Sequence, residues 1–156
     1  MKYKFLNIFI FITLLTSCGF KISNQYQQSN FEILEIVTSG DERINFNLKN
    51  KLKFISTTDD SKLLKIKLDT KKIKNIKEKN ARGEPAKYEI NVTTTVSYSI
   101  IGELDAAKFT IIKSGDYAAS NQYTNTLTNE KTLMRIITED ISNQIIKKVI
   151  NRINDL

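Results

Sequence analysis

The clearest pattern in the chain is an alternation of side-chain types between residues 87 and 100. Every second position there is apolar or threonine: Tyr88, Ile90, Val92, Thr94, Val96, Tyr98 and Ile100. Successive side chains of a strand point to opposite faces of a sheet, so this segment has one apolar and one polar face. The alternation predicts a long strand in an antiparallel or mixed sheet with one wetter face.

A second alternation precedes it, with apolar side chains at Leu64, Ile66 and Leu68. Ile73 and Ile76 then stand three positions apart, and this slip predicts a β-bulge or bend near residues 71–72. Between the two runs lies the stretch NARGEP, residues 80–85, in which Gly83 can adopt a positive φ. Together these features predict a long β-hairpin.

Shorter patterns predict two more strands. One runs from Phe31 to Val37 and ends at a turn over residues 38–41. The other begins at Phe109, after a turn at Gly102, and ends near Tyr117.

Two segments have helical periodicity instead. Ser39 and Glu42 match a capping box, which predicts a helix with one apolar face formed by Ile44, Leu48, Leu52 and Ile55. From Thr128 to Ile153 the apolar residues step by four, at Leu133, Ile137, Ile141, Ile145 and Val149. The order strand, helix, three strands, helix predicts an α+β fold. We expect a two-layer α/β sandwich, a mixed sheet of about four strands with both helices on one face, so that the other face is free for a partner or solvent.

The N-terminus has the layout of a secretory signal. A positive start, residues 1–4, precedes an apolar run from Phe5 to Leu15, which at about eleven residues is too short to span a bilayer. The run leads to Cys18, the one cysteine of the chain, in the sequence LTSC. This sequence resembles the lipobox of bacterial lipoproteins, in which the cysteine is acylated and becomes the new N-terminus; an ordinary signal peptide is the alternative. We expect residues 1–17 to be the signal peptide, 18–30 the lipidated cysteine and tether, and 31–156 a single domain.

Composition narrows the class of partner and of activity. The chain has 24 Lys and Arg against 17 Asp and Glu, an excess that favours anionic partners. For an exported, tethered protein, phosphorylated lipids are better candidates than nucleic acid, and we expect no nucleic-acid partner. The chain has no histidine and no spare cysteine, and acid pairs such as Asp59–Asp60 fit a turn or cap better than a metal site. We therefore expect no enzyme activity, metal or cofactor; a small hydrolase built on Ser or Asp groups is the alternative.

The most suggestive cluster is cationic. It leads along the predicted hairpin to its tip and comprises Lys71, Lys72, Lys74, Lys77, Lys79 and Arg82. Arginine can bind phosphate or carboxylate groups bidentately and lysine as a point charge. The alternative is a hairpin whose charges only keep the protein soluble.

Four segments together resemble the LptE family of lipopolysaccharide-assembly lipoproteins. They are CGF at the anchor, FEILEIVTSGD before the first helix, NARGEPAKYEINVTTTVSYSI across the hairpin and NEKTLMRIITEDISNQIIKKVI at the end. The resemblance implies an outer-membrane lipoprotein that sits as a plug in the LptD barrel, helps that barrel to assemble and takes part in lipopolysaccharide transport to the cell surface, by binding and without a cofactor. It implies a lipopolysaccharide contact at Arg82, and charge alone adds Lys77 and Lys79. Gly19 in place of Asp after the cysteine favours the outer membrane, where the protein would face the periplasm and the barrel lumen. The alternative is an accessory lipoprotein of another envelope machine for lipid transport or barrel assembly.

Overall fold

The computed structural model describes residues 31–55, 62–103 and 105–154. The predicted signal peptide, the lipidated Cys18 and the tether lie outside these described residues. The elements follow in the order β1 (Phe31–Gly40), α2 (Glu42–Ile55), β2 (Lys62–Lys79), β3 (Pro85–Ile100), β4 (Ala106–Ala118) and α3 (Tyr123–Asn154). This is the order of strands and helices that the patterns predict.

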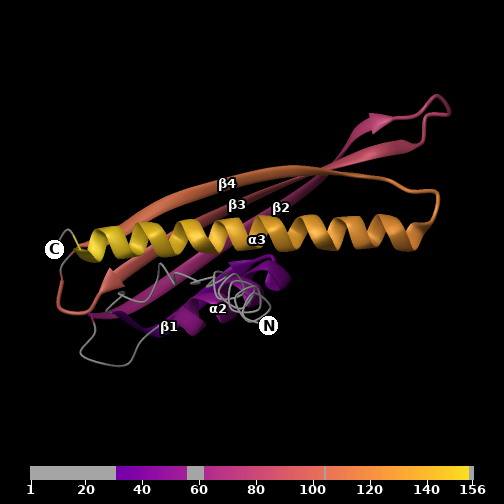
Figure 1. Cartoon of the computed structure of the whole chain (residues 1–156). Coiled ribbons are helices and arrows are strands. Elements are labelled where there is room, and N and C mark those ends of the chain that lie inside the picture. The colour runs from indigo at the N-terminus through magenta and orange to yellow at the C-terminus, as the bar shows by residue number, and fades with distance from the viewer. Residues whose placement is uncertain (1–30, 56–61, 104, 155–156) are drawn as a thin grey trace, which may run out of the picture.

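The four strands form one mixed sheet in the order β1-β2-β3-β4. β1 pairs with β2 in parallel, whereas β2–β3 and β3–β4 are antiparallel. A parallel pair needs a crossover connection, and α2 provides it. Both helices lie along the same face of the sheet (Figure 1), which confirms the predicted α+β architecture.

The core fills the space between the sheet and the two helices. The alternation in β3 is confirmed, because Ile90, Val92 and Val96 are fully buried and the intervening side chains are not. They belong to one apolar cluster with residues of β2 and both helices, among them Leu48, Leu64, Leu68, Ile141 and Ile145. Each such side chain stabilises the fold by about 1.5–3 kcal/mol relative to an exposed one.

The predicted capping box is wrong, because the residue that caps α2 is Asp41. Its carboxylate Oδ1 accepts a hydrogen bond from the backbone N–H of Ile44, at 3.0 Å. Ser39 is still part of β1, and its hydroxyl donates to Asp69 on β2, at 2.9 Å. Strand pairing therefore takes Ser39 away from the cap position and leaves that position to the next carboxylate.

The bulge predicted at residues 71–72 is also wrong. The register between β2 and β3 is continuous from Leu64 to Ile76 and shifts only between Ile76 and Lys79. The period seemed to slip because Lys72 and Lys74 take positions on the helix-covered face. Acidic residues of other elements neutralise them there, at 3.7 Å from Asp41 to Lys72 and 2.7 Å from Glu130 to Lys74.

Several element ends differ from the prediction. β1 extends to Gly40 and β4 begins at Ala106, because pairing with the neighbouring strand continues past the apolar residues. α3 begins at Tyr123, five residues before the predicted start. Its polar first turns are tied to the preceding loop by the Thr126 hydroxyl, which accepts from the Ser120 N–H at 2.8 Å. Within the described ranges, no helix combines the length and apolar character that a membrane span requires.

Candidate functional site

The β2–β3 hairpin projects at one end of the molecule, where its tip diverges from α3 (Figure 1). The tip is held by Asn80, whose side-chain Oδ1 accepts from the backbone N–H groups of Arg82 at 2.9 Å and Glu84 at 3.0 Å. Gly83 has a φ of +79°, as the sequence predicts, and its N–H donates to the Asn80 carbonyl at 2.9 Å. The two hydrogen bonds to the Asn80 side chain and the left-handed conformation of Gly83 fix the turn. The backbone that carries the Arg82 side chain is therefore held in one conformation.

The three predicted site residues fall into two groups. Lys79 and Arg82 are exposed, and among the described residues neither forms an ion pair with a carboxylate. Lys77 is different, because its Nζ lies 2.8 Å from Asp116 on β4 and 4.0 Å from Glu89 on β3. The hydrogen bond to Asp116 raises the pKa of Lys77 above its ordinary value. Lys77 thus joins strands, and Lys79 and Arg82 remain the cations open to an anionic ligand.

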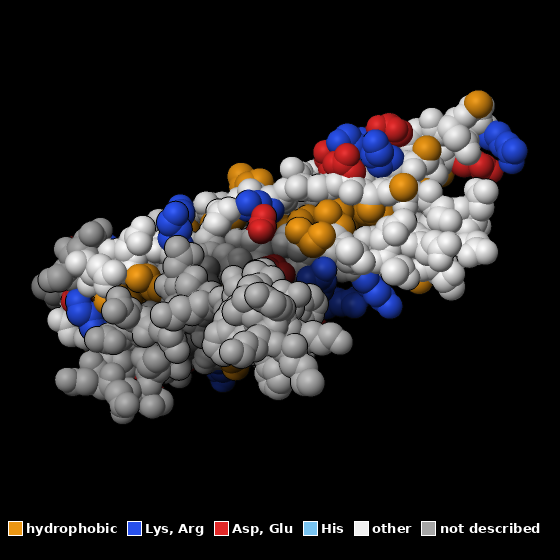
Figure 2. Space-filling model, in the orientation of Figure 1, with side chains coloured by type: hydrophobic (Ala, Val, Ile, Leu, Met, Phe, Trp, Pro, Cys, Tyr) orange, Lys and Arg blue, Asp and Glu red, His pale blue; other side chains and the backbone are white. Residues whose placement is uncertain are grey.

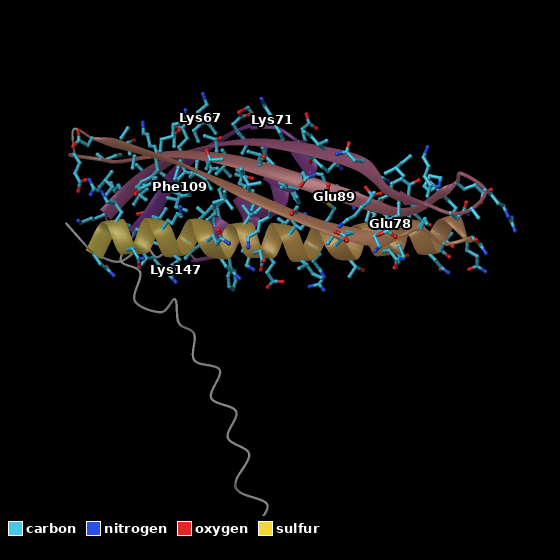
Figure 3. All side chains as sticks on the ribbon, turned by 90° about the horizontal axis from the view of Figure 1, so that it is seen from above. Lys67, Lys71, Glu78, Glu89, Phe109 and Lys147 are labelled. Carbon is cyan, nitrogen blue, oxygen red and sulfur yellow. The ribbon has the colours of Figure 1, made fainter. Side chains whose placement is uncertain are left out.

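The space-filling view agrees with this division. Cationic and anionic side chains intermingle along the hairpin, and Lys or Arg side chains stand at its far end (Figure 2). One mixed pair on the stem is Lys87 with Glu78, at 3.0 Å. Of the six cations in the predicted cluster, Lys72 and Lys74 lie on the helix-covered face. The six cations therefore do not form a continuous basic ribbon: Lys79 and Arg82 stand at or next to the tip, and Lys71 points away from α3 (Figure 3).

Below the tip, a cluster that the sequence patterns do not reveal ties the hairpin to α3. The ammonium of Lys74 lies 4.5 Å from the ring centroid of Tyr88 and 2.7 Å from the Glu130 carboxylate. Tyr88 and Tyr117 are cross-strand partners with stacked rings, 5.4 Å apart. The Tyr117 hydroxyl donates to Glu130 at 2.8 Å. The sequence does contain the parts of this cluster, because Lys74, Tyr88 and Tyr117 lie on one face of three strands. The strand register that brings them together is not visible in the sequence.

The electrostatics of this cluster depend on both charges. Desolvation alone would raise the pKa of Glu130, but the hydrogen bonds from Lys74 and Tyr117 outweigh it and hold the pKa below its ordinary value of 4.5. Burial alone would lower the pKa of Lys74, yet the bond to Glu130 raises it above its ordinary value. The carboxylate therefore stabilises the fold above about pH 4.5, and this contribution is lost as the pH falls through the lowered pKa of Glu130.

We expect Glu130→Gln to lower the free energy of unfolding by about 1 kcal/mol at pH 7, because the pair is partly exposed. The difference from the unchanged protein should shrink as the pH falls below 4.5, where the carboxylate becomes protonated. Urea unfolding at a series of pH values measures it. Glu78→Gln is the matched control, since the more exposed Glu78 side chain, paired with Lys87, should contribute only a few tenths of a kcal/mol. A pH-independent difference for Glu130→Gln would contradict the assignment.

The sheet face opposite the helices is mixed, with the exposed apolar side chains of Val37, Ile73 and Ile112 among polar ones. Figure 3 shows Lys67 and Lys71 pointing away from α3 on this face. Beside them run the outward hydroxyl side chains of β3, Thr93, Thr95, Ser97 and Ser99. Two shallow hollows of about 280 and 220 Å³ lie on this face, both lined by Lys67 and Ser97. No helix of the described residues covers it, as the predicted one-sided architecture requires.

Comparison with solved structures bears on the fold. A putative lipoprotein from Caulobacter crescentus superposes with a TM-score of 0.51 at 12% identity, over 77% of this chain and 90% of that one. Uncharacterized lipoprotein B from Nitrosomonas europaea gives 0.51 at 16% identity, over 87% and 93%. Rare lipoprotein B from Shewanella oneidensis gives 0.47 at 13% identity, over 78% and 94%.

No protein-family model and no curated protein sequence matches the chain. At these identities the structural likeness concerns the fold alone. The chain has the same overall fold as the Caulobacter crescentus and Nitrosomonas europaea proteins.

Proposed function

We propose that this protein is an outer-membrane lipoprotein that forms a complex with an LptD-like barrel, as plug and assembly factor, for lipopolysaccharide transport and insertion at the cell surface. The observation that carries the proposal is the projecting hairpin. Its tip presents Lys79 and Arg82 without carboxylate partners among the described residues, on a fold shared with two proteins described as lipoproteins. The identity of the barrel partner and of the lipid ligand is inferred from the four sequence segments that resemble the LptE family.

The anchor in this proposal is Cys18, acylated after removal of residues 1–17. Two or more acyl chains hold a protein stably at a membrane, whereas one chain does so only marginally. The two solved proteins of the same fold that are described as lipoproteins support this part. Gly19 in place of Asp favours sorting to the outer membrane, with the domain on the periplasmic side and in the barrel lumen.

The shape of the domain suits a plug. Its helix-free sheet face carries hydroxyl and lysine side chains, which can hydrogen-bond to a polar barrel wall, together with the exposed apolar side chains of Val37, Ile73 and Ile112. In this proposal Arg82 and Lys79 bind the phosphate groups of lipopolysaccharide, because a guanidinium binds phosphate bidentately and an ammonium adds a point charge. Lys77 is paired with Asp116 but its side chain is still exposed, so it is a weaker candidate for the same ligand than Lys79 and Arg82. The protein acts by binding, without catalysis or a cofactor.

Depletion of the protein in its own cells tests the proposal. We expect the amount of assembled barrel and the amount of lipopolysaccharide at the cell surface to fall together, and the full chain to restore both. The Cys18→Ala variant should fail to restore them, because it lacks the acylated residue. Unchanged barrel and unchanged surface lipopolysaccharide after depletion would exclude the proposed role and favour another envelope machine for lipid transport or barrel assembly.

A further inference from the structure

A cleft of about 480 Å³ lies between residues 43–51 of α2 and residues 127–139 of α3, with Lys72 of β2 in its lining. It is on the helix side of the sheet and includes neither Lys79 nor Arg82. Cavities of roughly 300–1,000 Å³ are the usual size for small-molecule sites. The volume is therefore sufficient for a small-molecule ligand. The residues that line the cleft determine the chemical class of that ligand.

Cations from the two helices face this cleft. On α2, Arg43 and Lys51 are eight residues apart and share a helix face; on α3, Lys131 and Arg135 are four apart. Two cationic stripes that line one cleft repel each other unless an anion lies between them. Arg43, Lys131 and Arg135 are largely exposed at the rim.

At one end of the cleft the protein supplies that anion itself. The Glu139 carboxylate lies 3.2 Å from Lys51 of α2 and 3.6 Å from Arg135 of α3. A single carboxylate thus bridges one cation from each helix.

At the other end, Arg43 and Lys131 have no such bridge. The two remaining acidic side chains of the lining already have other partners: Asp41 caps α2 and lies 3.7 Å from Lys72, and Glu130 binds Lys74 and Tyr117. Among the described residues, neither Arg43 nor Lys131 forms an ion pair. An external phosphate or carboxylate would occupy the place that Glu139 takes at the first end.

The floor of the cleft is apolar. Ile44 is buried, and Leu127 and Met134 are half-buried, all three lining the same space as the cations. A free inorganic anion would use the rim and leave these side chains in contact with water. A molecule with an anionic head and an apolar chain would use both parts of the lining.

We propose that the cleft between α2 and α3 is a binding site for an anionic amphiphile, with its phosphate or carboxylate head between Arg43 and Lys131 and its alkyl chain on Ile44, Leu127 and Met134. This site is separate from the hairpin tip. It does not depend on the proposed role with a barrel.

The chain offers a direct reporter of this site. It contains two methionines, Met1 and Met134, and Met134 lines the cleft. The full chain, made by cell-free synthesis with ¹³C-methyl methionine in a non-ionic detergent, gives one methyl signal in the cleft and one far from it in the sequence. We expect octyl phosphate to shift the Met134 signal saturably.

Two further probes separate head from chain. Octyl glucoside has the same chain without charge, and inorganic phosphate has the charge without the chain. At equal concentration, each of these two compounds should shift the Met134 signal at least tenfold less than octyl phosphate does. An equal response to octyl glucoside would overturn the role of the cations, and an equal response to inorganic phosphate would overturn the role of the apolar floor.

Matched variants locate the head group. Arg43→Ser with Lys131→Ser should weaken octyl phosphate binding at least tenfold, whereas Lys53→Ser with Lys147→Ser removes the same charge outside the lining of the cleft and should leave it unchanged. The unliganded spectrum of each variant checks the fold, and the single changes Arg43→Ser and Lys131→Ser replace the double variant if its Met134 signal is lost. Equal weakening by both double variants would show a response to net charge alone and overturn the site.

Discussion

An alanine at position 40 should lower the free energy of unfolding by about 3 kcal/mol or more, because it combines backbone strain with a collision. Gly40 ends β1 with a φ of +89°, and a Cβ there would lie 2.0 Å from the carbonyl oxygen of Thr70 on β2. That carbonyl also accepts the Asp41 N–H at 2.8 Å, so it cannot move without disturbing the start of α2. Urea unfolding followed by circular dichroism measures the loss.

Gly83→Ala is the matched control for this prediction. Gly83 also has a positive φ, +79°, but nothing lies within 4 Å of a Cβ built on it. Gly83→Ala should therefore lower the free energy of unfolding only by the backbone strain, about 1–2 kcal/mol. Equal losses at positions 40 and 83 would contradict the close approach of β1 to Thr70.

Removing the two tip cations should have the largest effect on ligand binding. We expect Lys79→Ser with Arg82→Ser to weaken lipopolysaccharide binding tenfold or more, because each lost charge-assisted hydrogen bond is worth about 1.5 kcal/mol or more. Both side chains are exposed and unpaired among the described residues, so the midpoint of thermal unfolding should stay nearly unchanged. Binding of purified lipopolysaccharide to the full chain, measured at one fixed salt concentration, tests this.

The control removes two exposed lysines elsewhere, Lys53 at the end of α2 and Lys147 on α3. Lys53→Ser with Lys147→Ser gives the same change in net charge. It should bind lipopolysaccharide nearly as well as the unchanged protein. A loss equal to that of the tip variant would mean that binding follows net charge and not the hairpin tip.

Local patterns were sufficient to predict the elements and their order. The alternation from Tyr88 to Ile100 is long and regular, and the face formed by Ile44, Leu48 and Leu52 repeats at helical spacing, so both follow from the burial of one face. The mixed sheet then follows from a helix between the first two strands.

The errors at the capping box and the bulge share one cause, which is that partners distant in the sequence decide the outcome. Asp69 holds Ser39 in the strand, so the cap passes to Asp41. Glu130 lies 56 residues from Lys74 and makes a lysine acceptable on the covered face. The sequence rule that places lysine on the solvent-exposed face of a strand cannot predict an ion pair on the helix-covered face.

The candidate site was predictable to the same extent. Turn chemistry alone places Arg82 at the hairpin tip, and the structure confirms that position. The ion pair that distinguishes Lys77 from the two tip residues depends on Asp116, 39 residues away on β4. The cleft between α2 and α3 needs the packing of two helices far apart in the chain, and no periodicity within either helix indicates it.

The central claim is the complex with a lipopolysaccharide-export barrel, and copurification tests it most directly. A tag after Leu156, mild solubilisation of outer membranes and mass spectrometry of the captured material would identify the partner. The account predicts an LptD-like barrel in about one-to-one amount with this protein. Recovery of a different envelope machine, or of this protein alone, would contradict it.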